Sequence, residues 1–277
     1  MAEPLCGLET TGAARGKIMT IALMYHDIVE KGATRASGFA SADADIYKLD
    51  TELFERHLKA IEAVKLNPQL VTDLSPDAKD SVLITFDDGG KSAYTHIADA
   101  LENHGWRGHF FVPTDFIDTP TFLSRSEIRE LDQRGHIIGS HSASHPLRMA
   151  VCSPEQLREE WHRSTSKLAD ITGKKIKVAS VPGGHFSKQV AAAADGQGIE
   201  ILFNSEPVAD FHNLGNCRIF GRYTIQQNTT AIEAAAIAEG KTMPRLRQYL
   251  FWNAKKLAKK AGGELYLDVR KRILSKR

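Results

Sequence analysis

The sequence has few cysteines, no long hydrophobic run and almost no net charge, and each of these absences excludes a class of protein. Only three cysteines occur, Cys6, Cys152 and Cys217, and their odd number and wide spacing argue against a disulfide framework. No apolar stretch approaches the roughly 18 residues that a membrane-spanning helix needs. A formal charge of +2 argues against a globally basic protein that binds nucleic acid.

The N-terminal residues also lack a targeting signal. Residues 1–16 are small and polar, without the basic start, the apolar run and the cleavage site of a signal peptide. We therefore expect an N-terminal tail at 1–17 and a cytoplasmic protein. The length of 277 residues suits one α/β barrel, and a hydrophobic content of 42% supplies enough apolar side chains for a sizeable core.

The stretch at 82–90, Val-Leu-Ile-Thr-Phe-Asp-Asp-Gly-Gly, predicts a buried strand that ends in two adjacent carboxylates. In α/β folds, ligands bind at the carboxyl ends of the strands. Asp87 and Asp88 repel each other unless they share a cation or a proton, which favours a metal site. Taken alone, the stretch could also be a simple turn, because Asp and Gly are favoured turn residues.

A second apolar run, at 137–139, is followed by a pair of histidines. His141 and His145 are four residues apart, so both imidazoles can reach one ion from a helical turn or a tight loop. Imidazole and carboxylate together suit zinc, or cobalt, nickel or manganese, better than calcium or magnesium. Three ligands, Asp88, His141 and His145, leave a coordination position open, as in catalytic sites. Asp87 is then available as a base.

Two short motifs carry a resemblance to a known family. Residues 85–89, Thr-Phe-Asp-Asp-Gly, and residues 141–145, His-Ser-Ala-Ser-His, resemble the first two motifs of the polysaccharide deacetylase family, or NodB-homology domain, which includes chitin and peptidoglycan deacetylases. The resemblance implies an α/β fold, a distorted (β/α) barrel of about seven parallel strands. It also implies that Asp87 is the general base and that Asp88, His141 and His145 bind the metal.

The chain departs from the family pattern in its second half. Ser180 stands where family members carry an Arg, and either Arg218 or Arg222 could partner the general base instead, although we favour a surface salt bridge for both. The turn of Pro182, Gly183 and Gly184 fits the family loop whose amide N–H stabilises an oxyanion. The Leu-x-His motif that supplies the family's general acid does not occur late in the chain, so catalysis needs another acid or is lost.

Four other residues are candidates for a place in the site. His185 and His212 are the candidates for the missing general acid. His26 and Asp27 follow the first predicted strand, at 18–24, and are expected on the catalytic face. They would bind substrate or support the ligands there, or else anchor a loop by hydrogen bonds. Residues 31–49 lack a clear period and are expected to form a loop over the site.

Strand and helix patterns alternate along the chain, which is the signature of a parallel α/β fold. Further strands are predicted at 82–86, 107–112, 137–140, 176–181, 199–203 and 219–221. Helices are predicted to begin near residues 51, 92, 125, 154, 188 and 231.

The composition changes near residue 244, so we expect a barrel domain at 18–243 and a basic amphipathic helical extension at 244–277. From residue 245 onward, eleven basic residues accompany two acids. An apolar stripe follows the helical period, at Leu246, Leu250, Ala254, Leu257 and Ala261. Such a helix can make peripheral contact with an anionic membrane, and a helix packed on the barrel gives the same pattern.

These features predict a metal-dependent hydrolase of carbon–nitrogen bonds that removes the acetyl group from an N-acetylated amino sugar. The expected substrate is a precursor in surface-polysaccharide or lipopolysaccharide biosynthesis, and the expected location is the cytoplasm, at the inner face of the membrane if the extension binds there. Two alternatives stay open, a metal-dependent amide hydrolase for a small non-sugar substrate and a catalytically inactive glycan-binding scaffold. No nucleic-acid partner is expected, because the extension has no recognisable binding motif.

Overall fold

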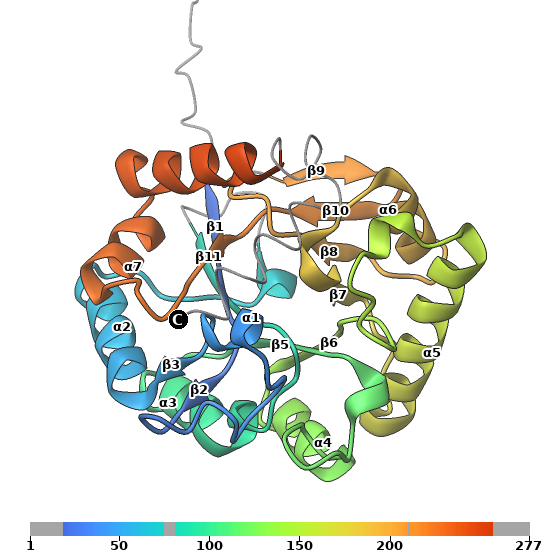
Figure 1. The fold of residues 1–277 in the computed structure, drawn as a ribbon, viewed down its shortest axis with the longest axis horizontal. Coiled ribbons are helices and arrows are strands. Elements are labelled where there is room, and N and C mark those ends of the chain that lie inside the picture. Colours follow the sequence, from blue (N-terminus) through green and yellow to red (C-terminus); the bar gives the residue numbers. More distant parts are fainter. Residues whose placement is uncertain (1–18, 75–80, 210, 257–277) are drawn as a thin grey trace, which may run out of the picture.

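The computed structural model describes residues 19–74, 81–209 and 211–256. Within these residues the strands form a curled sheet in the middle of the molecule, and the longer helices surround it (Figure 1). The sheet holds nine strands in the order β11-β1-β4-β5-β6-β7-β8-β10-β9. All are parallel to their neighbours except β9, which runs antiparallel to β10. Their bounds are β1 (Thr20–Tyr25), β4 (Ser81–Phe86), β5 (His109–Val112), β6 (Ile137–Ser140), β7 (Val178–Ser180), β8 (Ile201–Phe203), β9 (Phe211–Leu214), β10 (Cys217–Phe220) and β11 (Tyr223–Thr224).

The expected distorted (β/α) barrel is confirmed, with one parallel strand more than the sequence predicted. In the part of the chain that the structure describes, β11 and β9 lie at the two ends of the strand order and do not pair with each other. The barrel is therefore partly open. A separate parallel pair, β2 (Ile28–Val29) and β3 (Leu49–Asp50), lies outside the main sheet.

Capping residues set the ends of the helices. Ser124 and Glu127 form a capping box at the start of α4, and Ser153 and Gln156 form another at the start of α5. The α-helices are α1 (Ala42–Asp45), α2 (Thr51–Ala63), α3 (Ala98–Asn103), α4 (Arg125–Gln133), α5 (Pro154–Thr172), α6 (Lys188–Asp195) and α7 (Ala231–Ala238). Residues 93–97 form a π-helical turn ahead of α3, and short 3₁₀ turns occupy 71–73, 114–116, 149–151 and 182–184.

Apart from the exposed edge strand β9, the strands are largely buried on both sides of the sheet. Phe111, Phe203 and Phe220 pack together on the inner side, whereas Ile84 and Phe86 belong to the core between the sheet and the helices. All six residues of β4 are buried. This double burial explains why the strand sequences are continuous apolar runs rather than alternating ones.

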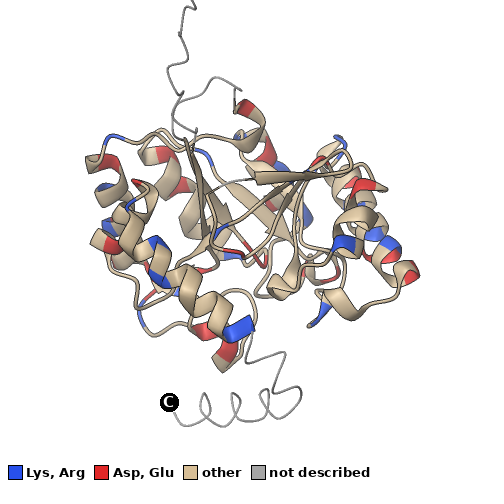
Figure 2. Cartoon of the chain, turned by 90° about the horizontal axis from the view of Figure 1, so that it is seen from above, with Lys and Arg blue, Asp and Glu red and all other residues tan. Residues whose placement is uncertain are grey.

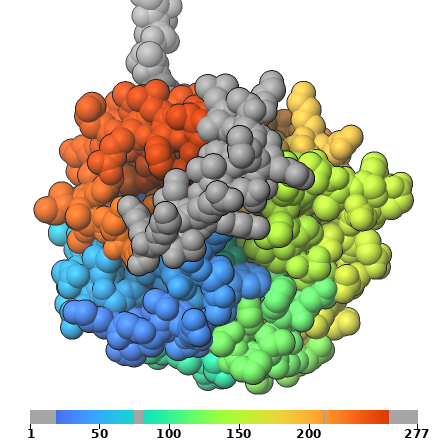
Figure 3. Space-filling view, viewed as in Figure 1, coloured from blue at the N-terminus to red at the C-terminus, as the bar shows by residue number. Residues whose placement is uncertain are grey.

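The chain follows a circular path, so that its late segments meet its early ones. In the space-filling view, successive segments lie around the molecule, and the orange C-terminal part meets the blue N-terminal part (Figure 3). Basic and acidic residues are interspersed along the outer helices (Figure 2). Among the described residues, none of the helices combines the length and the apolar character that crossing a membrane requires.

The described part of the C-terminal extension is a helix at residues 242–256. The side-chain amide of Gln248 accepts a hydrogen bond from the Thr224 N–H (3.1 Å) and donates one to the Thr224 carbonyl (2.9 Å). This part of the extension therefore packs on the barrel beside β11. Leu257 and Ala261 of the predicted stripe lie outside the described residues, as does the expected tail at 1–17. The domain boundaries at 18 and 244 stay predictions.

Candidate metal centre and catalytic cavity

The two motifs singled out in the sequence meet at one edge of the sheet. Asp87 and Asp88 directly follow β4, and His141 directly follows β6, with β5 between the two strands. The Asp88 Oδ1 atom lies 3.4 Å from His141 Nε2 and 3.3 Å from His145 Nε2. The three side chains therefore present one ligand atom each, all within 4.8 Å of one another.

The hydrogen bonds of His141 prepare it to bind a cation. Its Nδ1 atom lies 2.9 Å from the Ser180 carbonyl oxygen, which can only accept, so Nδ1 carries the proton. In the neutral ring, Nε2 then directs a lone pair toward the Asp88 carboxylate. Two acceptors that face each other are stabilised by a cation between them, and a histidine fixed by its other nitrogen is the usual arrangement in metal sites. The residues therefore fit a divalent metal.

The backbone of both motifs is strained at the site. Asp88, Ser142 and His145 all have positive φ values, of 73°, 63° and 54°. Side chains other than glycine adopt this region at a cost of order 1–3 kcal/mol each, so surrounding contacts must impose it. Strain of this kind is concentrated at functional sites.

Glu160 of α5 supplies such a contact. Its Oε2 atom accepts hydrogen bonds from the backbone N–H groups of Ala143 (2.9 Å) and Ser144 (2.8 Å), and its Oε1 atom accepts one from the Ser144 hydroxyl (2.6 Å). The loop that carries both histidines is therefore attached to a long helix outside the sheet. Sequence reasoning missed Glu160, because nothing in the pattern of α5 distinguishes it from the other acids there.

Asp87 is held by a buried arginine. Arg222 has no exposed side-chain surface, and its two terminal nitrogens donate to the two oxygens of Asp87 at 2.7 Å each. Burial alone would raise the pKa of Asp87, but the charge of Arg222 and the hydrogen bonds from its guanidinium lower the pKa by more, so that it lies below its usual value. The carboxylate is thus ionised at neutral pH, as a general base must be.

Arg222 replaces the arginine that the sequence lacks at position 180. The Ser180 hydroxyl accepts a hydrogen bond from Arg222 (2.7 Å) and lies 3.3 Å from an oxygen of Asp87. A small side chain on β7 leaves room for the guanidinium, which lies 5.7 Å from the ring centres of Phe111 and Phe203. The interpretation of Arg222 as a surface salt bridge was therefore wrong. Its position two residues after a buried strand was the available signal.

A cavity of about 920 Å³ opens beside these groups. Asp87, Asp88, His141 and His145 all line it. Of the other predicted site residues, His26, Gly183, Gly184 and His185 line the cavity as well. Pro182, Asp27, His212 and Arg222 do not line it.

Asp27 and His212 have other places in the structure. Asp27 is buried and accepts hydrogen bonds from the hydroxyls of Ser37 (2.5 Å) and Ser92 (2.7 Å), which corresponds to the loop-anchoring alternative. A Cβ atom on Gly90 would collide with the Asp27 carboxylate, so this contact also explains the second glycine of the motif. His212 is exposed on the edge strand β9, because that strand turns back along the outside of β10.

His26, Gly183 and Gly184 line the cavity near the cluster. The register of β1 against β4 pairs Tyr25 with Phe86, which places His26 level with Asp87. The Nδ1 atom of His26 is buried without a hydrogen-bond partner in the described residues, and its ring packs on Tyr47 with centres 4.6 Å apart. Gly183 and Gly184 adopt φ values of 59° and 67°, which suit glycine.

Sequence reasoning missed most of the cavity's outer wall. The expected place of residues 31–49 over the site is confirmed, since Phe39 and Tyr47 line the cavity, but the short helix α1 lies within this predicted loop. The helix at 242–256 lines it too, although its pattern indicated only a basic amphipathic helix. Five of its side chains take part, those of Arg247, Gln248, Phe251, Trp252 and Lys255.

Comparisons with known proteins agree with this geometry. Residues 75–202 match the family model for polysaccharide deacetylases. The chain is 31% identical over 134 residues to a peptidoglycan-N-acetylmuramic acid deacetylase of Bacillus subtilis, covering 47% of this chain and 49% of that protein. It is 25% identical over 201 residues to a putative polysaccharide deacetylase of the same organism, covering 70% of this chain and 67% of that protein.

A solved structure shares the fold. The polysaccharide deacetylase BC0361 from Bacillus cereus matches with a TM-score of 0.67 at 21% identity, over 79% of this chain and 69% of that one. The chain spans about half to two thirds of the length of three curated relatives that it matches, and a smaller share of the others.

Proposed function

This chain belongs to the polysaccharide deacetylase family through residues 75–202, and on that premise we propose that it hydrolyses the N-acetyl group of an amino sugar. One observation carries the proposal above the others. An ionised carboxylate, Asp87, is fixed by Arg222 directly beside a three-ligand cluster that lines a large cavity. A metal-binding scaffold would have no use for this second, separately positioned acid.

Asp88, His141 and His145 would hold one divalent transition metal, with zinc as the first expectation. Such an ion polarises a substrate carbonyl and lowers the pKa of water. The contact between His141 and the Ser180 carbonyl fixes the ring that would bind it.

Asp87 acts as the general base in this mechanism. It takes a proton from the water molecule whose oxygen attacks the acetamide carbon, while Arg222 keeps both carboxylate oxygens in place. The negative charge that develops on the carbonyl oxygen would be stabilised by the N–H of Gly183 or Gly184, which line the cavity. The carbon–nitrogen bond then breaks, the nitrogen takes up a proton, and acetate and a free amine leave.

The proton for the leaving amine needs a donor, and we assign that role to His26. His26 and His185 both line the cavity, whereas His212 does not. His26 is level with Asp87 on a neighbouring strand, and Tyr47 holds its ring. We expect His26→Ala to lose more activity than His185→Ala. Equal losses from the two variants would remove the basis for choosing His26.

Release of acetate from N-acetylated sugars tests the function itself. The metal-loaded chain would be assayed on N-acetylglucosamine oligomers beside Asp87→Asn and His141→Ala. We expect Asp87→Asn to retain metal but lose at least about a hundredfold in kcat, the lower range for general-base catalysis, and His141→Ala to lose metal as well. Acetate from small amides alone would favour the non-sugar amide hydrolase. A bound metal with no turnover of any substrate would favour the inactive scaffold.

We further propose that the sugar belongs to a surface-polysaccharide or lipopolysaccharide precursor and that the chain works in the cytoplasm at the membrane. Support comes from the helix at 242–256, on which Met243, Leu250 and Phe251 are at least 59% exposed beside basic residues. Sedimentation with vesicles would test this. Binding to anionic but not zwitterionic vesicles, weakened by Leu250→Glu, is the expected result. Equal recovery from both vesicle types would exclude an electrostatic membrane contact.

A further inference from the structure

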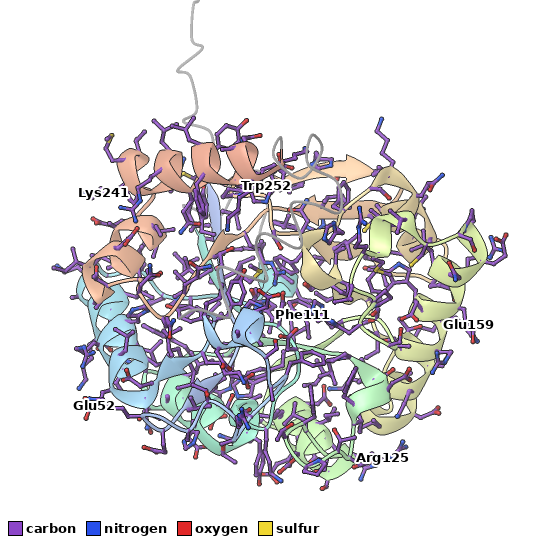
Figure 4. All side chains as sticks on the ribbon, in the orientation of Figure 1. Glu52, Phe111, Arg125, Glu159, Lys241 and Trp252 are labelled. Atoms are coloured by element: carbon purple, nitrogen blue, oxygen red, sulfur yellow. The ribbon has the colours of Figure 1, made fainter. Side chains whose placement is uncertain are left out.

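The loop between β2 and β3, at residues 30–48, brings an aromatic ring against one of the candidate metal ligands. The ring centre of Phe39 lies 4.9 Å from that of His145. The structure describes every residue of this loop, and apart from the four residues of α1 none of them belongs to an α-helix or a strand. In the view of Figure 4, α1 lies over the middle of the barrel. Side-chain contacts must therefore set the course of the loop.

Lys48 supplies the most direct of these contacts from inside the loop. Its side chain is only 1% exposed. The ammonium group donates hydrogen bonds to the backbone carbonyls of Thr34, Ser37 and Phe39, at 2.5, 2.9 and 2.6 Å. A lysine has three N–H groups, so each of them has a carbonyl acceptor. The Asp45 carboxylate, at 3.6 Å, provides the opposite charge.

A lysine is rarely buried to this extent unless its charge is paired and hydrogen-bonded. The backbone next to Lys48 is fixed independently, because the N–H of Leu49 donates to the Asp27 carbonyl at 3.1 Å and β3 pairs with β2. The ammonium group is thus an internal cation at a set position. The three carbonyls that it binds lie 9 to 14 residues earlier in the chain. Lys48 therefore determines where the backbone at 34–39 runs.

Phe39 connects this backbone to the metal centre. Its carbonyl accepts from Lys48, and its ring packs edge-on against Phe116 and Phe122, with centres 4.8 and 5.0 Å apart. The same ring lies against the imidazole of His145. Because His145 sits in a loop with a positive φ value of 54°, its ring depends on such neighbours for its orientation.

We propose that Lys48 is a positioning residue for the metal centre. By holding the carbonyl of Phe39, it sets the Phe39 ring against His145 and thereby fixes the imidazole that would bind the metal. Lys48 itself does not line the cavity. The inference rests on the proposed function for the role of the metal centre, and it adds a residue that neither of the two sequence motifs contains.

Zinc affinity, measured by competition with a chelator, tests the connection from Lys48 through Phe39. Lys48→Met, which keeps the length but not the N–H donors, and Phe39→Leu should each weaken zinc binding by about 10–100-fold, as for residues that orient metal ligands. The double variant should bind zinc no more weakly than Phe39→Leu, because both changes remove the same effect. Lys31→Met, at an exposed position of the same loop, is the matched control.

Two outcomes of this experiment would overturn the inference. The first is a zinc affinity in Lys48→Met equal to that in Lys31→Met. The second is a double variant whose loss is the product of the two single losses, since Lys48 would then act independently of Phe39. If Lys48→Met does not fold, Phe39→Leu alone decides, because it leaves the carbonyl contacts of Lys48 in place. An unchanged zinc affinity in Phe39→Leu would overturn the inference.

NMR spectra of the metal-free chain give a readout that needs neither metal nor activity. The ring current of Phe39 shifts the signals of the His145 ring protons, which His145→Gln would assign. Lys48→Met and Phe39→Leu should move these signals, and Lys31→Met should not. The signals of His109, at the other end of β5, should stay in place, whereas a general loosening of the fold would move them too.

Acetate release separates the inference from the proposed reaction. Weaker zinc binding and shifted His145 signals in Lys48→Met, with no turnover by any form of the chain, would support the positioning role and overturn the reaction. Turnover by the unaltered chain, with equal kcat, equal zinc affinity and unshifted His145 signals in Lys48→Met, would overturn the positioning role alone.

Discussion

Arg222 is a buried side chain that connects several parts of the site through its hydrogen bonds. It donates to Asp87 through two nitrogens, to Thr85 and Ser180 through the same two, and to the Asn204 carbonyl through Nε. The guanidinium group thus donates five hydrogen bonds inside the barrel. Removing the side chain would leave the Asp87 carboxylate buried without its counter-charge, which costs more than an exposed ion pair contributes.

We expect Arg222→Met to lower the free energy of unfolding by about 3–5 kcal/mol, the usual cost of breaking a buried ion pair. Urea denaturation measures the change, and acetate release should fall in parallel because Asp87 loses its orientation. Arg56→Met is the control, since Arg56 is 57% exposed and its ion pair with Glu52 is long, at 3.9 Å. A similar, small loss in both variants would contradict the role given to Arg222.

At the residue scale, the sequence predicted the residues of the site but not the partner of Asp87. Asp87, Asp88, His141 and His145 could be predicted because each pair lies within five residues at the end of an apolar run. The contact between Asp87 and Arg222 joins residues 135 positions apart. No local pattern encodes such a contact, so the same guanidinium was compatible with a surface salt bridge until the register of the sheet was known.

At the scale of elements, α5 positions the metal loop from outside the sheet. Its Glu160 satisfies two consecutive N–H groups in a loop whose Ser142 and His145 have positive φ. Carboxylate acceptance of backbone N–H groups is a charge-assisted contact, stronger than a neutral one. The helix thereby imposes a backbone shape that the loop residues would not adopt alone.

Glu160→Gln tests this coupling between helix and loop. Loss of the charge should weaken metal binding by about 10–100-fold, as for other residues that orient metal ligands, with little change in secondary structure. Competition with a chelator would measure the affinity. Glu159→Gln provides the control, because Glu159 is exposed on the same helix and forms a long ion pair with Arg163, at 3.9 Å. Identical affinities in the two variants would show that the loop holds its shape without Glu160.

Elements with local signals were predicted better than those that depend on tertiary contacts. The capping boxes at Ser124 and Ser153 and the apolar run of β4 all appear where the sequence indicated. The helix at 242–256 was expected as an amphipathic element, yet its contribution to the cavity was not. Its packing depends on Gln248 meeting the backbone of β11, and neither partner has a sequence signature.

At the scale of the whole molecule, three buried histidines link stability to pH. Burial lowers the pKa of His57, His109 and His136 to about 4 each, because the interior disfavours the charged ring. His109 illustrates the cause, since its Nε2 accepts a hydrogen bond from Val71 N–H and its Nδ1 donates to the Ile84 carbonyl. Both nitrogens are committed to a neutral ring.

Stability should therefore fall as the pH drops from about 6.5 toward 4. In this window the unfolded chain takes up protons on these histidines, with an ordinary pKa of about 6.5, while the folded chain does not. His145 acts in the opposite direction, because, despite burial, contact with Asp88 raises its pKa. Urea denaturation of the metal-free chain at pH 7.5, 5.5 and 4.5 measures the balance. In His109→Gln the free energy of unfolding should depend less on pH. A free energy of unfolding that does not change with pH in the unaltered chain would contradict the link between these histidines and stability.

The position of Arg222 late in the chain also has a consequence for synthesis on the ribosome. When β4 leaves the exit tunnel, the counter-charge of Asp87 is still 135 residues away. The base acquires its partner only after the last strands have joined the sheet, and the helix at 242–256 follows later still. A nascent chain that ends with the shared segment, at residue 202, would therefore carry the three candidate metal ligands without the arginine that holds Asp87. The proposed activity would begin only as the final turns of the chain dock.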